Sequence, residues 1–323
     1  MPSVTEQIFS AQEEQQGMLR SFIGREQELQ RLHTFLGNDS PWILHVIGHG
    51  GMGKSVFLRA IKKKYHSFSV LVAPLNFAEN NAGEQSSIDL LSLFSSLANA
   101  VHDRCDALAW QEFDAFCTST RRQLMQQLST STDLTQNMYI GDEAAARENK
   151  LTMTLSDDPR IQELLHQASE LVLEALCKLM ETFKPDQLIV TIDTCEWLNE
   201  SVNMGATLAI VQRMLLRLHD DLERRGKLCH VVLASNSHLS LPAIAGEEQL
   251  PFPLVGLRQA AVYQQLVRVG IQDSELCEHI YKITYGIAAC VTLVCELWQN
   301  LPDDEKPRSI HYSGTFKLIN IPQ

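Results

Sequence analysis

One short segment constrains this chain more than any other: Gly48-His49-Gly50-Gly51-Met52-Gly53-Lys54-Ser55. It matches the pattern GxxxxGK[ST], in which glycines let the backbone curl until successive N–H groups point at one anion. The apolar run from Trp42 to Ile47 precedes it and predicts a buried parallel strand. Residues 55–65 predict the helix that follows. The order of strand, glycine loop and helix therefore predicts a phosphate-binding loop.

The chemistry of such a loop assigns roles to its residues. The positive end of the following helix adds to the attraction for phosphate. Lys54 is expected to reach the β- and γ-phosphates, and the Ser55 hydroxyl is expected to bind Mg²⁺. Val56, the next residue, completes the expected binding segment. The ligands predicted from this pattern are ATP or ADP together with Mg²⁺.

A strand next to the loop strand is expected to carry an acid at its end. The run Leu188 to Asp193 reads LIVTID and ends in a carboxylate, which is expected to help hold Mg²⁺ and to take part in catalysis. Hydrolysis also needs a group that orients or deprotonates the attacking water, and Glu196 is the candidate. Thr194 occupies the position where many ATPases have a second acid. Two alternatives stay open here, namely that Asp193 caps the next segment and that Glu196 is a structural glutamate.

Strands alternate with helices over most of the chain, which predicts an α/β fold with a mainly parallel sheet covered on both faces. We expect a three-layer P-loop NTPase sandwich followed by a small helical domain. The expected strands lie at 42–47, 68–77, 188–193, 228–235 and 252–257. The segment from Phe22 to Leu29 is expected to open the first helix, and the other expected helices cover 55–65, 87–128, 159–183, 205–225, 259–269, 273–284 and 287–300. The expected divisions are a polar lead (1–19), a nucleotide-binding domain (20–257) with an exposed insertion (129–158), a helical lid (258–300) and a tail (301–323).

Composition limits the partners and the compartment. The formal net charge of −12 argues against nucleic acid, which needs clustered Lys and Arg. The eight cysteines form no CxxC pair, and several lie in apolar runs, as free thiols do in a reducing compartment. The first twenty residues lack an apolar signal segment, and no apolar run is long enough to cross a membrane. These features predict a cytoplasmic protein without a membrane partner.

Four segments together resemble a known family: FIGREQEL, the glycine loop GHGGMGKS, the strand end IDTCEWL, and LPFPLVGL with the helices after it. In this order they are similar to the STAND class of signal-transduction P-loop ATPases and to the origin-recognition-like AAA+ modules. The resemblance covers roughly residues 20 to 300. It implies that Phe22, Ile23 and Arg25 lie beside the adenine and ribose, and that residues 258–300 form a lid over the nucleotide.

The chain departs from that family at three places. Gly286-Ile287-Ala288 falls where the lid usually carries Gly-x-Pro, and the proline is missing. Asn236 follows the strand at 228–235, where an arginine that senses the γ-phosphate is usual; asparagine can donate a hydrogen bond but carries no charge. Thr194 replaces the second acid. An arginine on transferring phosphate is worth about 10³-fold or more in rate, so tight binding with slow turnover is expected.

These observations lead to three hypotheses. The first is a regulatory switch in which ATP closes the lid and changes an assembly surface, with slow Mg²⁺-dependent hydrolysis and a protein partner or self-assembly. The second is a non-catalytic scaffold that uses the nucleotide as a structural ligand. The third, a DNA-associated ATPase of the origin-recognition type, is disfavoured by the acidic charge. Family members usually continue into a winged helix and repeat arrays, so the chain is expected to be a fragment or to act with a separate partner.

Overall fold

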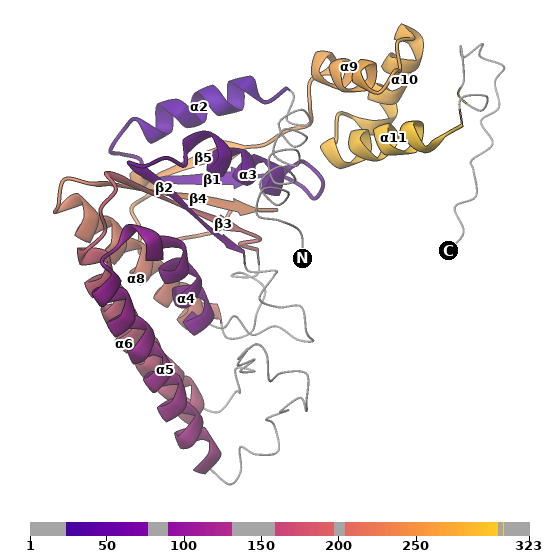
Figure 1. The fold of residues 1–323 in the computed structure, drawn as a ribbon. Coiled ribbons are helices and arrows are strands. Elements are labelled where there is room, and N and C mark those ends of the chain that lie inside the picture. Colours follow the sequence, from indigo (N-terminus) through magenta and orange to yellow (C-terminus); the bar gives the residue numbers. More distant parts are fainter. Residues whose placement is uncertain (1–23, 77–89, 131–158, 197–203, 303–305, 307–323) are drawn as a thin grey trace, which may run out of the picture. The chain divides into compact units, whose positions relative to one another are not determined.

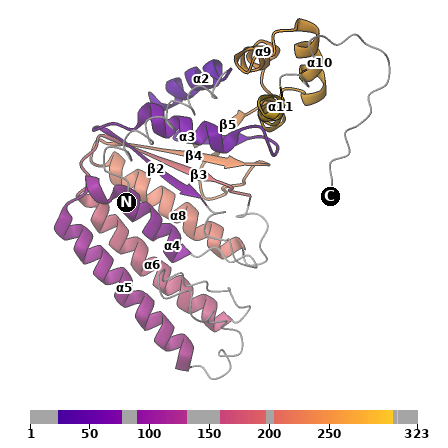
Figure 2. The ribbon, with the colours of Figure 1, turned by 45° about the vertical axis from the view of Figure 1, so that its right-hand side comes forward.

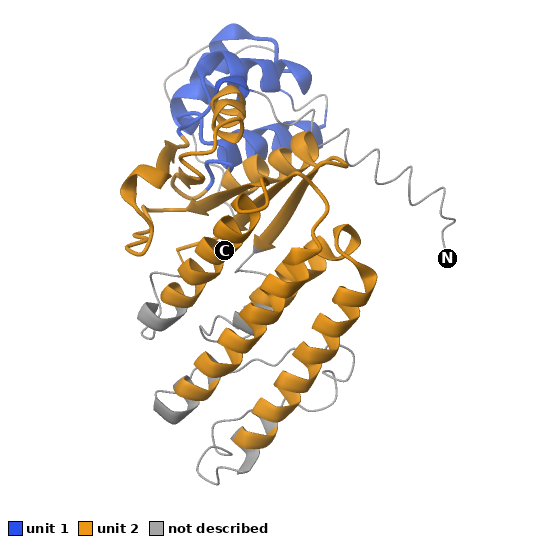
Figure 3. Ribbon diagram, turned by 90° about the vertical axis from the view of Figure 1, so that its left-hand side faces the viewer, with its two compact units in different colours: residues 1–27, 51–53, 255–323 blue, residues 28–50, 54–254 orange. Residues whose placement is uncertain are grey.

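The computed structural model describes residues 24–76, 90–130, 159–196, 204–302 and 306. The expected polar lead, most of the expected insertion at 129–158 and most of the tail lie outside the described residues. The chain divides into two compact units, which Figure 3 colours separately. One unit contains residues 28–50 and 54–254. The other contains residues 1–27, 51–53 and 255–323.

The larger unit contains a five-stranded sheet in which every pairing is parallel. The spatial order is β2-β3-β4-β1-β5. The strands are β1 (Ile43–Ile47), β2 (Val70–Asn76), β3 (Gln187–Asp193), β4 (Leu228–Ser235) and β5 (Gln249–Pro253). The three central strands are buried almost throughout, because helices cover both faces. The α/β fold with a parallel sheet, expected from the sequence, is confirmed.

Helices form the two outer layers of this unit (Figures 1 and 2). On one face lie α3 (Lys54–Tyr65) and α2 (Glu26–Leu36), the latter stopped by Gly37. On the other face α4 (Leu90–Val101) and α8 (Met204–Glu223) pack on the sheet, and α6 (Pro159–Glu181) packs on both of them. The helix α5 (Ala107–Thr130) packs on α6 as the outermost element of this side. The main apolar core fills the space between the sheet and these helices.

Two element boundaries differ from the sequence expectation. The helix expected at 87–128 is two helices, separated by a 3-10 turn at His102–Arg104. The carboxylate of Asp106 accepts hydrogen bonds from the N–H groups of Leu108 (2.9 Å) and Ala109 (3.3 Å), and so begins α5 as an N-cap. The last strand lies at 249–253 instead of 252–257. Pro251 and Pro253 are tolerated there because β5 is an edge strand, which pairs on one side only.

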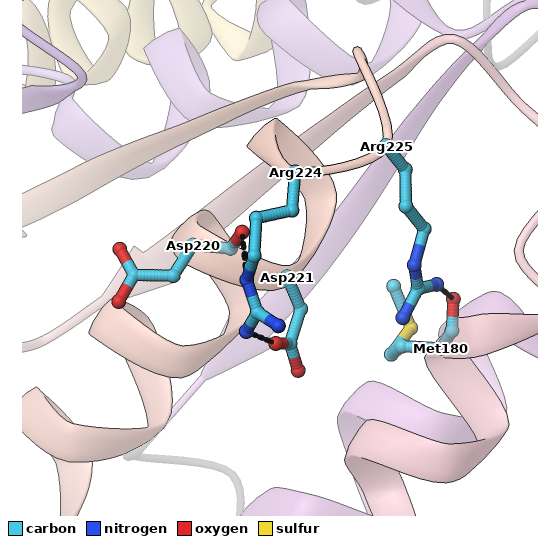
Figure 4. Close-up of polar contacts among 5 residues, drawn as sticks. All are labelled: Met180, Asp220, Asp221, Arg224 and Arg225. Atoms are coloured by element: carbon cyan, nitrogen blue, oxygen red, sulfur yellow. Dashed lines mark hydrogen bonds and ion pairs between the residues drawn. The ribbon is translucent and has the colours of Figure 1, made fainter.

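Two adjacent arginines after α8 make different contacts (Figure 4). Arg224 pairs with Asp221 and donates to the Asp220 carbonyl (3.2 Å), both within its own helical segment. Arg225 instead donates from Nη1 to the carbonyl of Met180 (2.6 Å), near the end of α6. Arg225 therefore joins two helices, and Arg224 does not.

We expect Arg225→Ala to lower the free energy of unfolding by about 1 kcal/mol, because a charged donor to a helix-end carbonyl is lost. The matched variant Arg224→Ala should change it by less than about 0.5 kcal/mol, since the Arg224 side chain is 72% exposed and its contacts stay within one helical segment. Urea denaturation followed by circular dichroism measures both. Equal losses in the two variants would contradict the assignment of different roles.

The strand β1, which lies between β4 and β5, holds a buried histidine without a hydrogen-bond partner among the described residues. His45 has no exposed surface, and neither ring nitrogen finds a donor or acceptor there. The ring of His238 contacts it edge to face, at a centroid distance of 4.9 Å. Burial, followed by the charge of His238, lowers the pKa of His45 from 6.5 to about 4. The folded protein therefore keeps this imidazole neutral.

This lowered pKa predicts that the folded protein loses stability in acid. Between pH 6.5 and about 4 the unfolded chain protonates His45 and the folded chain does not, so stability is complete above pH 6.5 and falls as the pH drops. The loss between pH 7 and pH 5 should be about 2 kcal/mol from this group. His45→Leu should remove that share of the pH dependence, as measured by urea midpoints at the two pH values. The same slope in the variant would assign the effect to another group, such as His230, whose pKa burial also lowers.

The smaller unit contains three helices with their own core: α9 (Gln259–Arg268), α10 (Ser274–Thr284) and α11 (Ala288–Asn300). The side chain of Asp273 caps α10 by accepting from the N–H groups of Glu275 and Leu276, both at 2.9 Å. The helix ends at Tyr285 and Gly286, which both have positive φ, as expected for a left-handed C-terminal cap. The three helices agree with their predicted ranges within about a residue.

Candidate functional site

The glycine loop leaves β1 at its carboxyl end, and α3 begins at Lys54. The N–H of Gly48 donates to the carbonyl of Ser235 (3.2 Å), which ties the first residue of the loop to the end of β4. Lys54 and Ser55 are the first two residues of α3. The loop therefore leads into a helix N-terminus, where the partial positive charge of the helix lies.

The side chain of Lys54 lies against its own loop. Its Nζ donates to the carbonyls of Gly48 (2.7 Å) and His49 (3.3 Å), and to Oδ1 of Asn236 (2.7 Å). An ammonium group has three donors, and all three are used here. The cation is thus held beside the loop by hydrogen bonds.

The turn after β3 places the two acids. The carboxylate of Asp193 accepts from the N–H of Thr194 (2.9 Å), and Thr194 has a φ of 58°, in the left-handed region. The N–H of the next residue, Cys195, donates to the carbonyl of Ala234 in β4 (2.9 Å), and the Cys195 side chain is fully buried. The turn is therefore anchored to the neighbouring strand, and this anchor positions Glu196.

Asn236 connects Glu196 to the loop lysine. Its Nδ2 donates to Oε1 of Glu196 (2.8 Å), while its Oδ1 accepts from Lys54. The second carboxylate oxygen of Glu196 is buried and finds no hydrogen-bond partner in the part of the chain that the structure describes. We call the connected set of Lys54, Asn236 and Glu196 the polar bridge. Each member was a candidate from the sequence, but the sequence did not predict that Asn236 would join the other two.

The sheet order modifies one expectation. Asp193 was expected on a strand next to the loop strand, but β4 lies between β1 and β3. Parallel strands still bring the carboxyl ends of β1, β4 and β3 to one edge, so the loop, Asn236 and Asp193 share that edge. This is why the amide of Asn236, at the end of the middle strand, lies between the lysine and the glutamate.

The remaining loop residues, Gly51 to Gly53, belong to the smaller unit. Gly51 and Gly53 have φ values of 80° and 89°, which only glycine adopts without strain. The carbonyl of Met52 accepts from Nη2 of Arg25 (2.9 Å), and Arg25 is only 4% exposed. Phe22 and Ile23, expected beside the base with Arg25, lie outside the described residues. His49, Gly50, Ser55 and Val56 are exposed.

These residues fit a magnesium–nucleotide complex. Gly51 and Gly53 have the positive φ that a curled phosphate loop requires, and Lys54 supplies a cation. The described residues contain no group of three His, Cys, Asp or Glu side chains that could hold a metal. Mg²⁺ would therefore rely on Ser55, Asp193 and phosphate oxygens, and this is how Mg²⁺ usually binds with nucleotides.

The sheet order, the glycine loop after β1 and the acid at the end of β3 define a P-loop NTPase. The chain belongs to the AAA ATPase domain family, whose model matches residues 21–231. This confirms the expectation of a P-loop ATPase of the AAA+ type. No curated protein sequence matches the chain at a significant level.

Solved structures with a similar fold come from the two groups that the sequence resembles. One is a STAND protein with a tetratricopeptide repeat sensor from Pyrococcus horikoshii, with 14% identity and a TM-score of 0.43, covering 85% of this chain and 30% of that one. Another is Aeropyrum pernix Orc1 in complex with DNA, with 15% identity and a TM-score of 0.46, covering 86% and 60%. A third is Drosophila ORC bound to DNA, with 14% identity and a TM-score of 0.39, covering 86% and 60%. The chain thus spans 30% to 60% of the length of these proteins, and the likeness concerns the fold alone.

A membrane span was not expected from the sequence. Among the helices of the described residues, none combines the length and the apolar character that crossing a bilayer requires.

Proposed function

We propose that this chain is a nucleotide-dependent regulatory switch that binds ATP and hydrolyses it slowly in the presence of Mg²⁺. The observation that supports it most is the polar bridge, in which Asn236 bonds both Lys54 (2.7 Å) and Glu196 (2.8 Å). A phosphate-binding cation and a candidate base are connected through one amide. The presence or loss of the γ-phosphate at Lys54 can therefore alter the position of Glu196 through the Asn236 side chain alone.

Each member of the bridge has a distinct role in the proposed reaction. Lys54 exchanges the carbonyls of its loop for phosphate oxygens and neutralises their charge. Glu196 accepts a proton from the attacking water, and the hydrogen bond from Asn236 orients its carboxylate. Asp193 and the Ser55 hydroxyl would hold Mg²⁺, which supplies charge neutralisation for the phosphates when bound. Thr194 in place of an acid and Asn236 in place of an arginine support a slow rate.

We propose that residues 258–300 act as the lid. Supporting this, α9, α10 and α11 share a core of their own, built around Val262, Leu266 and Val291. A segment with its own core can move as one body, which is the behaviour that lid closure requires. Closure would change the surface presented to a protein partner or to a second copy of the chain.

A second candidate function is a scaffold that holds the nucleotide without hydrolysing it. The turn at Thr194 favours the scaffold. The N–H of Thr194 donates to the Asp193 carboxylate that catalysis would use, and the Thr194 side chain supplies no second carboxylate. A protein partner is expected in both cases. The net charge of −12 counts against DNA as that partner.

We place the protein in the cytoplasm, with support from its thiols. All eight cysteines are free, and six are buried. Burial raises the pKa of Cys105 and of Cys117 to about 11, so these thiols act as apolar core groups and not as nucleophiles. Such usage is typical of a reducing compartment.

The test is ATP turnover by the purified chain with and without Mg²⁺, with the retained nucleotide identified after denaturation. Mg²⁺-dependent release of phosphate supports the switch. Retention of ATP or ADP without phosphate release supports the scaffold. A chain that neither retains nor turns over nucleotide would contradict both.

A further inference from the structure

Two carbonyl groups of the glycine loop accept hydrogen bonds from donors in the smaller unit, to which residues 51–53 belong. An anion-binding loop aims its N–H groups at the ligand, so its carbonyls point elsewhere and need their own partners. Two consecutive carbonyls have them here. The Gly51 carbonyl accepts from the N–H of Ala289 (2.9 Å), and the Met52 carbonyl accepts from Nη2 of Arg25 (2.9 Å).

Arg25 is itself firmly placed. The residue is only 4% exposed, although arginine is rarely buried without a partner. The preceding residue, Gly24, has a φ of 82°, and a Cβ built there would lie 2.1 Å from the Cβ of Ala261 in α9. The backbone before Arg25 is thus packed directly on a helix, and only glycine fits. This contact fixes the point from which the guanidinium reaches the loop.

Gly51 of the loop also packs closely on its neighbours. Gly51 has a φ of 80°, and a Cβ there would lie 3.2 Å from both the Ala289 Cβ and the Ile287 Cγ2. The first turn of α11 therefore packs against Gly51 and bonds its carbonyl. Arg25 and the N–H of Ala289 in α11 thus donate hydrogen bonds to the carbonyl groups of two successive loop residues, Met52 and Gly51.

We propose that Arg25 is a positioning residue for the phosphate loop: by bonding the Met52 carbonyl, it keeps the loop N–H groups ordered for the phosphates of the nucleotide. The inference rests on the proposed nucleotide binding and deepens it. It assigns Arg25 a task that concerns phosphate, whereas the family resemblance implies a place beside the base and ribose. A residue that orders the phosphate loop should affect the binding of every phosphate ligand, whereas a residue at the base or ribose should affect only the binding of nucleotides.

The discriminating probe is a phosphate chain without a base. Binding of Mg²⁺–ATP and of Mg²⁺–tripolyphosphate is measured by calorimetry for the wild type, Arg25→Met, Arg25→Lys and Lys54→Ala. Arg25→Met should weaken both ligands by the same factor, about tenfold, the usual effect of losing one charge-assisted hydrogen bond. Arg25→Lys should restore most of the affinity, because an ammonium can still donate to the carbonyl. Arg122→Met, on the exposed surface of α5, is the matched control and should change neither affinity.

Amide hydrogen exchange of the ligand-free proteins provides a readout independent of binding. Arg25→Met should speed exchange in the peptide that contains Gly51 to Gly53, while exchange in β1 and β4 stays at the wild-type rate. Lys54→Ala should not speed exchange in the loop peptide. Faster exchange throughout the core in Arg25→Met, with no recovery in Arg25→Lys, would show a general stability effect and overturn the proposal.

The remaining outcomes are also decisive. Loss of ATP affinity with unchanged tripolyphosphate affinity would place Arg25 at the base or ribose and overturn the proposal. Unchanged affinity for both ligands would overturn it as well. If the wild type binds neither ligand, the proposed function fails, and the exchange rate of the loop in Arg25→Met then decides separately whether Arg25 orders it.

Discussion

Replacing Lys54 with alanine should lower the affinity for Mg²⁺–ATP by about 100-fold or more, because the charge-assisted contacts of one ammonium with phosphate oxygens are lost. The fold should survive. The Lys54 ammonium bonds two carbonyls of its own loop and the exposed Asn236, and it occupies no place in the apolar core. Calorimetric titration with ATP measures the affinity, and urea denaturation tests the stability.

The matched control is Lys62→Ala, which removes an exposed lysine from the last turn of the same helix. It carries the same change of charge, so it separates the specific contact from the overall electrostatic attraction for an anion. ATP should bind this variant within about twofold of the wild type, as expected for a screened surface charge. If Lys54→Ala bound ATP as tightly as Lys62→Ala, the phosphate-site assignment would be wrong.

Replacing Glu196 with glutamine should reduce ATP turnover by roughly 10²-fold or more, the usual contribution of a general base. Glutamine keeps an Oε1 that can accept from Asn236, so the polar bridge stays intact and only the basicity is lost. ATP affinity should therefore remain close to that of the wild type. Single-turnover phosphate release, with enzyme in excess over ATP, measures the rate of a slow enzyme directly.

Asn236→Ala is the companion variant for this experiment. It removes the hydrogen bonds to both Lys54 and Glu196 but leaves the base in place, so its rate should fall less than that of Glu196→Gln. Full turnover in Glu196→Gln would assign the base to another group and reduce Glu196 to a structural acceptor for Asn236. Turnover absent from the wild type itself would instead favour the scaffold.

The local features of this protein could be predicted from the sequence because they depend on short-range rules. Glycines at 51 and 53 predict the loop, since few other residues adopt the positive φ observed there. The apolar runs that end at Ile47, Asp193 and Ser235 predict buried parallel strands, because both faces of such strands are covered. Helix periodicity predicts α9, α10 and α11 in the same way.

Some features were less predictable because the signal is weak or lies elsewhere in the chain. The break between α4 and α5 depends on a single N-cap, Asp106, within a nearly continuous helical pattern. The position of β5 depends on its pairing with β1, from Ile43–Gln249 to Ile47–Pro253, and not on its own composition. The prolines of β5 disfavour a strand locally, but an edge position tolerates them.

The sequence by itself determined the class of protein, the phosphate loop and the individual candidates Lys54, Asp193, Glu196 and Asn236. Only the tertiary structure decided how they are connected. Because β4 lies between β1 and β3, Asn236 is brought between a lysine 182 residues away and a glutamate 40 residues away in the chain. Arg25 likewise meets Met52 across 27 residues. Such contacts depend on the order of strands and on the packing of distant segments, which no local pattern of residues encodes.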